Sequence, residues 1–583
     1  MKKVLGFLLA MLLFQIVSAA DKPLVSSTID FLDYVFLYKG SEDHYPLAEY
    51  EQALRELAES GVKKIYLRVN VCGLTHYPTK VSALYGDDNA LHWNAPAPAK
   101  RLAETYKHYD PCAETIRIGK KYGMEVWAWE SIFDDAGVKY PRPGKGTDPA
   151  WQEAWSKRDG WALIDPFYLD NMDAFAMRDP AKAMPQSEID EIDRKAAEYP
   201  VEKIVFTNAP NRAGMPPVRF TPADVSIYTS SDNAAYHRYT RPYTVKISET
   251  SDRRNRLEIS GLSITDPYVK IAHKGMPKDN KFSFVLSSER GQCEVYNSRG
   301  ELIPTVWGAT TGSNPVPTGS ALNFELRSDT AWDYMTRQVG FKVGEVAQNR
   351  YYYGMAEFNV PKAMEHKVAR FAEIAEYPFD GFMFNTRCHS PVKNPEEYGF
   401  NPEVLEKFQA RFGRKYRGGE ADLAGIFQLR AEAIAEFFQR CRKIAGERPI
   451  YMSAPVPLEL KSRSDYNPVF GPLPWLYRRY FADGSIDGVV MIGTNFRNGT
   501  GFADYFTPEI TGGKPIKIGI FREMLNRPKG YDFAADLEQI RKAGLDEVEL
   551  YESAVINCNP VLGEIIQGRV PADWSKDIPL KWE

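Results

Sequence analysis

Eight short runs of apolar residues alternate with amphipathic helical stretches along this chain, and this alternation limits its fold more than any other feature. Most of the runs continue without polar alternation, which is typical of strands that are buried on both faces. They span residues 31–38, 63–70, 124–130, 380–386, 448–454, 486–492, 515–521 and 547–552. Helical patterns lie between several of them, at 47–60, 112–122, 363–377, 402–412, 423–445 and 533–543. Eight strand–helix units are the number that closes a barrel, so we predict an α/β fold of the (β/α)8 TIM barrel type.

A doubly wound open sheet would give the same local pattern. No Gly-x-Gly-x-x-Gly segment follows the first run, which disfavours the dinucleotide-binding form of that alternative. Closure of the barrel therefore depends on the count of eight runs.

The barrel pattern is interrupted after its third strand, between residues 179 and 350. Short alternating runs such as PYTVKISE and KFSFVLSSE are separated there by turn-forming residues, which is typical of a β-sandwich. We predict that 21–178 and 351–583 form the barrel and that 179–350 is an inserted β-sandwich domain. Such an insert would leave the barrel at its carboxyl rim, where it would either flank a substrate cleft or act only as a spacer.

The amino terminus has the pattern of a secretory signal peptide. Two lysines precede an apolar run over residues 4–17, and a Ser-Ala-Ala segment closes it at residue 20. This run is too short to cross roughly 30 Å of hydrocarbon as a helix, and no second run of eighteen or more follows it. We therefore expect a secreted or periplasmic protein without a membrane span, whose residues 1–20 are removed.

Charge and cysteine content exclude other classes of function. Lys and Arg number 73 against 77 Asp and Glu, a net charge of −4, so nucleic acid is not an expected partner. The six cysteines include no Cys-x-x-Cys pair. We expect neither a metal site nor a cofactor.

Three glutamates close predicted strands and are candidate catalytic residues: Glu130, Glu523 and Glu552. Hydrolysis of a glycosidic bond needs one carboxylic acid to protonate the leaving oxygen and a second carboxylate to attack or to activate water. Because catalytic groups of such barrels lie at the carboxyl ends of the strands, these glutamates are expected to face one another across the mouth. The alternative is that one or more forms a buried structural ion pair with an arginine.

Four arginines at the same predicted strand ends suggest an anionic substrate. Arginine makes two-pronged contacts with planar carboxylates, so a sialic or uronic acid would suit such a cluster; otherwise each arginine orients a catalytic carboxylate or fixes a loop. The candidate substrate-binding residues are Arg68, Asn70, Asn385, Arg387, His389, Asn495, Arg497 and Arg522.

Several segments resemble a known family. The block ARFAEIAEYPFDGFMFNTRCHSP, followed by EYGFNPEVLEKFQARFG, is similar to secreted bacterial glycosyl hydrolase-like TIM-barrel proteins, often called family-10-like. The segments GVKKIYLRVNVCG and GKKYGMEVWAWESIFDDA carry the same resemblance. It covers the barrel and not the insert, and it implies action on carbohydrate. Members of the family commonly carry an acidic residue near the end of strand four, where this chain has Asn385.

The sequence thus predicts a secreted glycoside hydrolase that acts on a carbohydrate through paired carboxylates, and the four arginines favour an anionic sugar. Rim loops rich in Trp and Tyr suit this substrate, because sugar rings stack on aromatic rings. Two alternatives stay open. One is a carbohydrate-binding barrel without catalysis. The other is a polysaccharide lyase or esterase, although no Gly-x-Ser-x-Gly nucleophile elbow supports an esterase.

Overall fold

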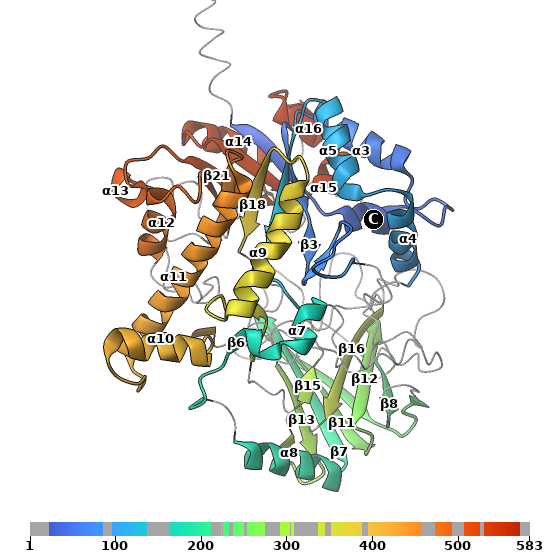
Figure 1. The fold of residues 1–583 in the computed structure, drawn as a ribbon. Coiled ribbons are helices and arrows are strands. Elements are labelled where there is room, and N and C mark those ends of the chain that lie inside the picture. Colours follow the sequence, from blue (N-terminus) through green and yellow to red (C-terminus); the bar gives the residue numbers. More distant parts are fainter. Residues whose placement is uncertain are drawn as a thin grey trace, which may run out of the picture.

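The computed structural model contains a closed barrel of eight parallel strands (Figure 1). In barrel order the strands are β1 (Leu24–Ile29), β2 (Lys64–Arg68), β5 (Glu125–Ser131), β18 (Gly381–Asn385), β19 (Ile450–Pro455), β20 (Gly488–Ile492), β21 (Lys517–Glu523) and β22 (Glu547–Tyr551). Since β1 pairs with β22, the sheet closes, and the predicted TIM barrel is confirmed while the open sheet is excluded. The structure describes residues 23–85, 96–136, 164–182, 185–210, 223, 225–231, 237–249, 254–274, 292–303, 305–307, 336–343, 351–386, 395–455, 473–492, 506–524 and 530–571.

The expected first strand at 31–38 is wrong, because this segment forms helix α2 (Phe31–Leu37). Asp30 caps the helix by accepting a hydrogen bond from the backbone N–H of Leu32 at 3.2 Å. The true first strand, β1, carries Ser26, Ser27 and Thr28 in its middle. Their hydroxyls donate to groups of β22, which satisfies them in the barrel wall. A strand with three central hydroxyls lacks the apolar run by which the other strands are recognised.

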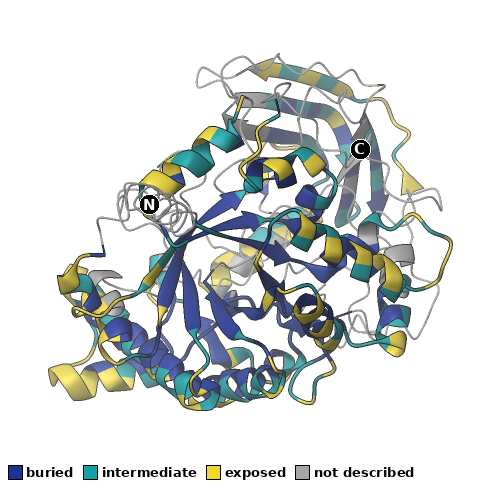
Figure 2. Ribbon diagram, turned by 90° about the horizontal axis from the view of Figure 1, so that it is seen from above, coloured by how far each residue is buried: buried dark blue, intermediate teal, exposed yellow. Residues whose placement is uncertain are grey.

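Helices cover the outside of the barrel, as Figure 2 shows from above. Their apolar faces and the outward side chains of the strands form one large buried cluster. The main covering helices are α3 (Leu47–Glu59), α5 (Pro111–Lys121), α9 (Pro361–Glu376), α11 (Glu420–Ala445), α12 (Leu473–Ala482), α14 (Phe533–Lys542), α15 (Ser553–Asn557) and α16 (Pro560–Ile566). Helix α10 (Pro402–Phe412) packs against α11.

The connection from β5 to β18 holds most of the remaining strands. Strands β6 (Phe175–Met177) and β17 (Tyr351–Ala356) pair antiparallel where the chain leaves the barrel and returns to it. Between them come helix α8 and two five-stranded sheets, whose orders are β10-β11-β7-β13-β14 and β15-β16-β12-β8-β9. Apolar side chains of both sheets form one buried cluster of their own. The bounds are α8 (Gln186–Glu198), β7 (Val201–Pro210), β8 (Val225–Ser230), β9 (His237–Arg238), β10 (Thr244–Glu249), β11 (Arg254–Ile264), β12 (Tyr268–Lys274), β13 (Gln292–Asn297), β14 (Leu302–Ile303), β15 (Thr305–Trp307) and β16 (Thr336–Val343).

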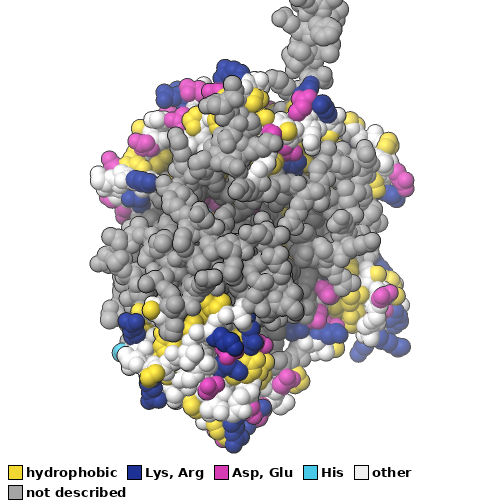
Figure 3. All heavy atoms as spheres, turned by 180° about the vertical axis from the view of Figure 1, so that it is seen from behind, with side chains coloured by type: hydrophobic (Ala, Val, Ile, Leu, Met, Phe, Trp, Pro, Cys, Tyr) yellow, Lys and Arg dark blue, Asp and Glu magenta, His cyan; other side chains and the backbone are white. Residues whose placement is uncertain are grey.

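Two further observations concern membrane-spanning helices and surface charge. Within the described part of the chain, no helix is both long and apolar enough to cross a membrane. On the face shown in Figure 3, basic and acidic side chains are interspersed over the described surface. This mixing fits the small net charge of −4.

Candidate functional site

The inside of the barrel is filled mainly by aromatic and aliphatic side chains, and the buried Lys64–Glu547 ion pair lies among them. The aromatic and aliphatic side chains form one cluster: Tyr66, Trp127, Trp129, Met383, Tyr451, Val490 and Phe521, with Ile492 and Tyr551 packed against it. Because successive side chains of a strand point to opposite faces, these residues show which positions face inward on each strand. Polar residues that continue the inward series, and residues of the segments that directly follow the strands, lie at the carboxyl ends that form the mouth, where barrel enzymes carry their active sites.

Two carboxyl groups meet at the mouth, those of Asp33 and Glu552. Glu552 directly follows β22, and Asp33 lies in the first turn of α2, which follows the neighbouring strand β1. The two side chains are within hydrogen-bonding reach of each other. Glu552 is buried and Asp33 is partly buried. The carboxyl group of Asp33 is therefore both shielded from solvent and close to a second group of the same charge, Glu552.

The pKa of Asp33 is raised well above its usual value. Burial is the largest cause, and the charge of Glu552 and the hydrogen bond with it raise the pKa further. The charge of Asp30 also raises the pKa of Asp33, by a smaller amount, and the positive charge of Arg68 lowers it. Asp33 Oδ2 is buried and has no donor among the described residues. A proton held between the two carboxyl groups would supply that donor, so the pair is suited to keep one proton at a pH where free carboxylic acids have lost theirs.

Arg68 fixes the helix that carries Asp33. Its Nη1 donates to Asp30 Oδ2 at 2.8 Å, and its Nη2 lies 3.6 Å from Asp134 Oδ2. The guanidinium also lies against the ring of Trp129, 5.4 Å from its centroid. Since Asp30 is the N-cap of α2, this ion pair holds the start of the helix in place. Arg68 was expected to bind substrate; its charge is instead balanced by two aspartates of the protein.

Glu523 is the third carboxylate at this edge of the barrel. It ends β21, two residues after the inward-facing Phe521, and its register partner on β22 is Tyr551. It is only partly buried, and pleat alternation places it on the inward face. Asp33, Glu552 and Glu523 are thus carried by or follow three consecutive barrel strands, β1, β22 and β21. Of the three glutamates predicted from the sequence, Glu523 and Glu552 lie at the carboxyl ends of the neighbouring strands β21 and β22.

Glu130 lies on the other side of its strand. Its neighbours Trp129 and Ser131 face inward, so Glu130 points outward, where Arg370 Nε on α9 donates to Glu130 Oε1 at 3.0 Å. Arg370 also contacts Asp135 at 3.1 Å. The structure therefore favours the buried ion pair over the catalytic role for Glu130, and it does not bring this residue to Glu523 and Glu552.

Arg522 also points outward. Its Nε and Nη2 donate to the carboxylate of Asp536 on α14, at 2.6 and 3.0 Å. The two-pronged contact expected with a substrate is thus made with the protein. The remaining predicted residues Arg387, His389, Asn495 and Arg497 lie outside the described residues.

The two described asparagines of the prediction belong to a polar ring at the mouth. Asn70 exchanges hydrogen bonds with the backbone of Ser131, at 3.1 and 2.8 Å. Asn385 donates to Ser131 Oγ at 3.2 Å and accepts from Ser453 Oγ at 2.8 Å. Both amides hold strand ends together. The fourth barrel strand, β18, therefore ends in the amide of Asn385 and not in a carboxylate.

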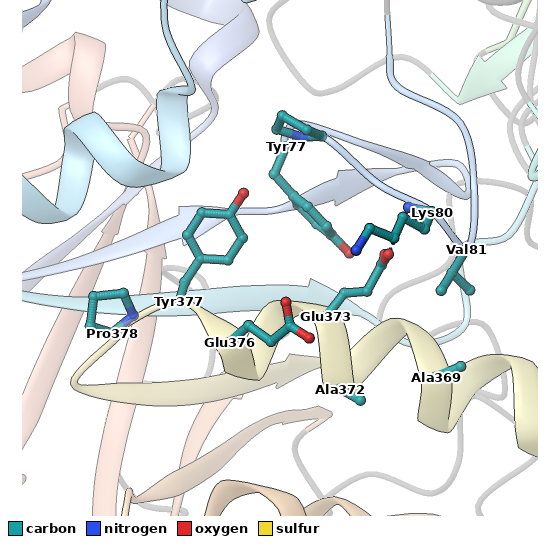
Figure 4. A pocket seen from close by; sticks show the side chains of 10 residues that line it. Tyr77, Lys80, Val81, Ala369, Ala372, Glu373, Glu376, Tyr377 and Pro378 are labelled. Atoms are coloured by element: carbon teal, nitrogen blue, oxygen red, sulfur yellow. Dashed lines mark hydrogen bonds between the residues drawn. The ribbon is translucent and has the colours of Figure 1, made fainter.

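A separate groove of about 520 Å³ lies on the outer wall, between the loop 77–81 and helix α9 (Figure 4). Tyr77, Lys80, Glu376 and Tyr377 are among its lining residues. Glu373, also in the lining, accepts hydrogen bonds from Thr79 and from the backbone of Lys80. None of the lining residues belongs to the cluster inside the barrel, so the groove is separate from the carboxylates of the mouth.

Asp30 and Asp33 are not among the candidate catalytic or substrate-binding residues predicted from the sequence, because the segment after β1 is predicted there as a strand that contains Asp33. The signal that was present is helical. Phe31, Tyr34 and Val35 have the spacing of one apolar helix face, and Asp30 directly precedes it as a capping residue.

No family model matches this chain, and no curated protein matches it. Among solved structures, it is similar to the catalytic domain of a β-amylase from Paenibacillus polymyxa, with 9% identity and a TM-score of 0.37 over 95% of this chain and 100% of that one. It is also similar to a β-galactosidase from Marinomonas ef1, with 7% identity and a TM-score of 0.33 over 91% of this chain and 54% of that one. A morphinone reductase, an enzyme of another class, matches with 14% identity and a TM-score of 0.24 over 39% of this chain and 53% of that one. At this level the likenesses carry no argument about function, which has to come from the residues of the mouth.

Proposed function

We propose that this protein is a glycoside hydrolase whose active site is the mouth of the barrel. The observation that carries the proposal is the Asp33–Glu552 pair, two neighbouring carboxyl groups at the rim where barrel enzymes perform their chemistry, in which burial and the charge of Glu552 raise the pKa of Asp33. Glu523, from the next strand, supplies a further carboxylate. An acid that keeps its proton beside a second carboxylate meets the two requirements of glycosidic bond hydrolysis.

In the proposed reaction, Asp33 donates its proton to the glycosidic oxygen as the bond to the sugar breaks. Glu552 keeps Asp33 protonated until that step, through its charge and the hydrogen bond between them. Glu523 either attacks the anomeric carbon or removes a proton from the attacking water. The roles assigned here shift the acid from Glu130, which is occupied by Arg370, to Asp33.

The substrate is proposed to be a carbohydrate without a required negative charge. A sialidase-like specificity would need unpaired cations at the mouth. Of the two described candidate arginines, Arg68 is bound by aspartates and Arg522 points away. Of the four arginines predicted from the sequence, Arg387 and Arg497, which lie outside the described residues, are the two left to bind an anionic sugar.

A carbohydrate-binding barrel without catalysis is the second candidate. The observation in its favour is Asn385, whose amide is hydrogen-bonded on both sides at the strand-four position where resembling proteins commonly carry an acid. This candidate predicts that sugars bind and are not cleaved.

Two further parts of the proposal concern the whole chain. We propose that residues 1–20 direct the protein out of the cytoplasm. We also propose that 179–350 is an inserted β-sandwich domain, and the shared apolar cluster of the two five-stranded sheets supports this.

The function is tested by incubating the purified protein with a panel of neutral, uronic and sialylated glycosides and analysing the released sugars by mass. The proposal predicts release of sugar by the wild-type protein and its loss in Asp33→Asn. Binding of a sugar without release, measured by calorimetry, would support the second candidate instead. Release of sialic or uronic acid alone would restore the anionic substrate.

A further inference from the structure

Two histidines and an aspartate meet on the surface beside helix α4 (Pro96–His108). Asp43 and His44 belong to the loop after α2, and His108 is the last residue of α4. One ligand atom from each of the three lies within 4.8 Å of the other two. The imidazole rings of His44 and His108 stack with centroids 3.9 Å apart, and His44 Nδ1 lies 2.9 Å from Asp43 Oδ1.

The backbone that carries these side chains is held by its own contacts. Arg101 Nη1 donates to the carbonyl of Tyr38 at 3.2 Å, and Thr105 Oγ1 accepts from the N–H of Tyr45 at 2.8 Å. Arg101, Thr105 and His108 are spaced by four and three residues, so they share one face of α4. The same helix face thus fixes the loop 38–46 and presents His108 to it, and ligand side chains on a fixed backbone cost less to order around an ion.

Donor chemistry selects the kind of ion. Two imidazole nitrogens and one carboxylate oxygen are ligands of Zn²⁺ and of related transition metals, whereas Ca²⁺ and Mg²⁺ prefer oxygen alone. A tetrahedral ion with bonds of about 2.1 Å needs donors about 3.4 Å apart, which lies within the 4.8 Å limit on the separation of these three ligand atoms, so rotation of the side chains has to bring them to this spacing. Binding would replace the Asp43–His44 hydrogen bond and leave the fourth position to water.

We propose that Asp43, His44 and His108 bind a divalent transition-metal ion of the Zn²⁺ type, which cross-links the loop 38–46 to the end of α4. The sequence predicts no metal site, because the two histidines are far apart in the chain and belong to no ligand motif. The site is independent of the proposed hydrolase activity, since none of its residues belongs to the mouth.

The test is titration of the full-length chain, prepared without an affinity tag and stripped of metal, with Zn²⁺ and with Co²⁺. Calorimetry is expected to show one Zn²⁺ site that weakens by at least about tenfold in His44→Ala and in His108→Ala, since even partners beyond the ligands change affinity that much. His237→Ala, which removes an exposed histidine on β9, is the matched control and should bind as the wild type does.

Co²⁺ absorption distinguishes this site from binding by cysteine. The proposal predicts visible bands that lack the intense sulfur-to-metal transition and that disappear in the His44→Ala/His108→Ala double variant. The Zn²⁺-dependent rise in the thermal unfolding midpoint should disappear in the same variant. Unchanged stoichiometry and affinity in the double variant, or a sulfur-to-metal band, would overturn the proposal. So would the absence of saturable Zn²⁺ binding in the wild type.

Discussion

Asp33 is the residue on which the proposed chemistry depends most. An acid whose pKa is higher in the folded than in the unfolded state binds more protons when folded, at every pH between the two pKa values. The free energy of unfolding therefore falls as the pH rises through that window. At neutral pH the carboxyl pair is a source of instability, which is common where function and not stability determines a residue.

Asp33→Asn is accordingly expected to stabilise the protein while it abolishes activity. The gain should be about 1 kcal/mol at pH 8 and should vanish below about pH 3, where the wild-type carboxyl is protonated in both the folded and the unfolded state. Urea unfolding at the two pH values measures it. A loss of stability at pH 8 would mean that Asp33 is ionised and favourably paired in the folded protein.

Glu552→Gln separates the two causes of the pKa shift of Asp33. Removing the neighbouring negative charge lowers the pKa of Asp33, although burial keeps it above the usual value. Since the reaction needs protonated Asp33, the alkaline limb of the pH profile of kcat/KM should move to lower pH. An unmoved limb would show that another group carries the proton.

Arg370→Met is expected to affect stability through the ion pair at Glu130. The substitution leaves the buried carboxylates of Glu130 and Asp135 without their guanidinium and should cost about 3 kcal/mol. Glu130→Gln should leave kcat per folded molecule close to that of the wild type. Urea unfolding and active-site titration measure the two effects, and a large fall in kcat for Glu130→Gln would return this residue to the catalytic set.

At the scale of elements, helix α2 links the barrel wall to the acid. Asp30→Ala removes the N-cap of α2 and the main partner of Arg68, so it should lower both stability and kcat. The loss of the cap alone costs about 1 kcal/mol. Asp110→Ala, which removes the N-cap of α5 on the outer wall, is the control and should lower stability while leaving kcat unchanged. Equal kcat losses in the two variants would show that α2 does not position the acid.

Sequence patterns predicted those strands whose side chains are mostly apolar and buried. Seven barrel strands lie within or overlap apolar runs, because a strand between the barrel interior and the helices is buried on both faces. Strand β1 escaped notice because its hydroxyls are satisfied by β22, more than 500 residues away along the chain. A contact of that range leaves no local pattern.

The candidate site was predicted less well for a related reason. Strand ends were located to within one or two residues, yet a single position decides whether a side chain faces the mouth or the helices. Glu523 and Arg522 are adjacent, and only the former faces inward. Sequence identified the residue types at the rim, while the pleat of each strand decided which of them meet.

At the scale of the whole molecule, the barrel is expected to fold without the segment between β6 and β17. Tyr351 pairs with Met177, so the two ends of the connection already lie side by side. Replacing residues 183–350 by a short Gly/Ser linker keeps the Arg178–Glu397 ion pair and should leave a cooperatively folded barrel. Circular dichroism and thermal unfolding check this. Loss of the cooperative transition would show that the insert is part of the barrel's core and that the boundary at 179–350 is wrong.

The central claim is that the carboxyl groups of Asp33, Glu552 and Glu523 act together on a glycosidic bond at the barrel mouth. The most direct test compares kcat for release of a sugar by the wild type, Asp33→Asn and Glu130→Gln under identical conditions. We expect a fall of at least about 100-fold for Asp33→Asn, as for removal of a general acid, and no comparable fall for Glu130→Gln. Unchanged turnover in Asp33→Asn would contradict the account.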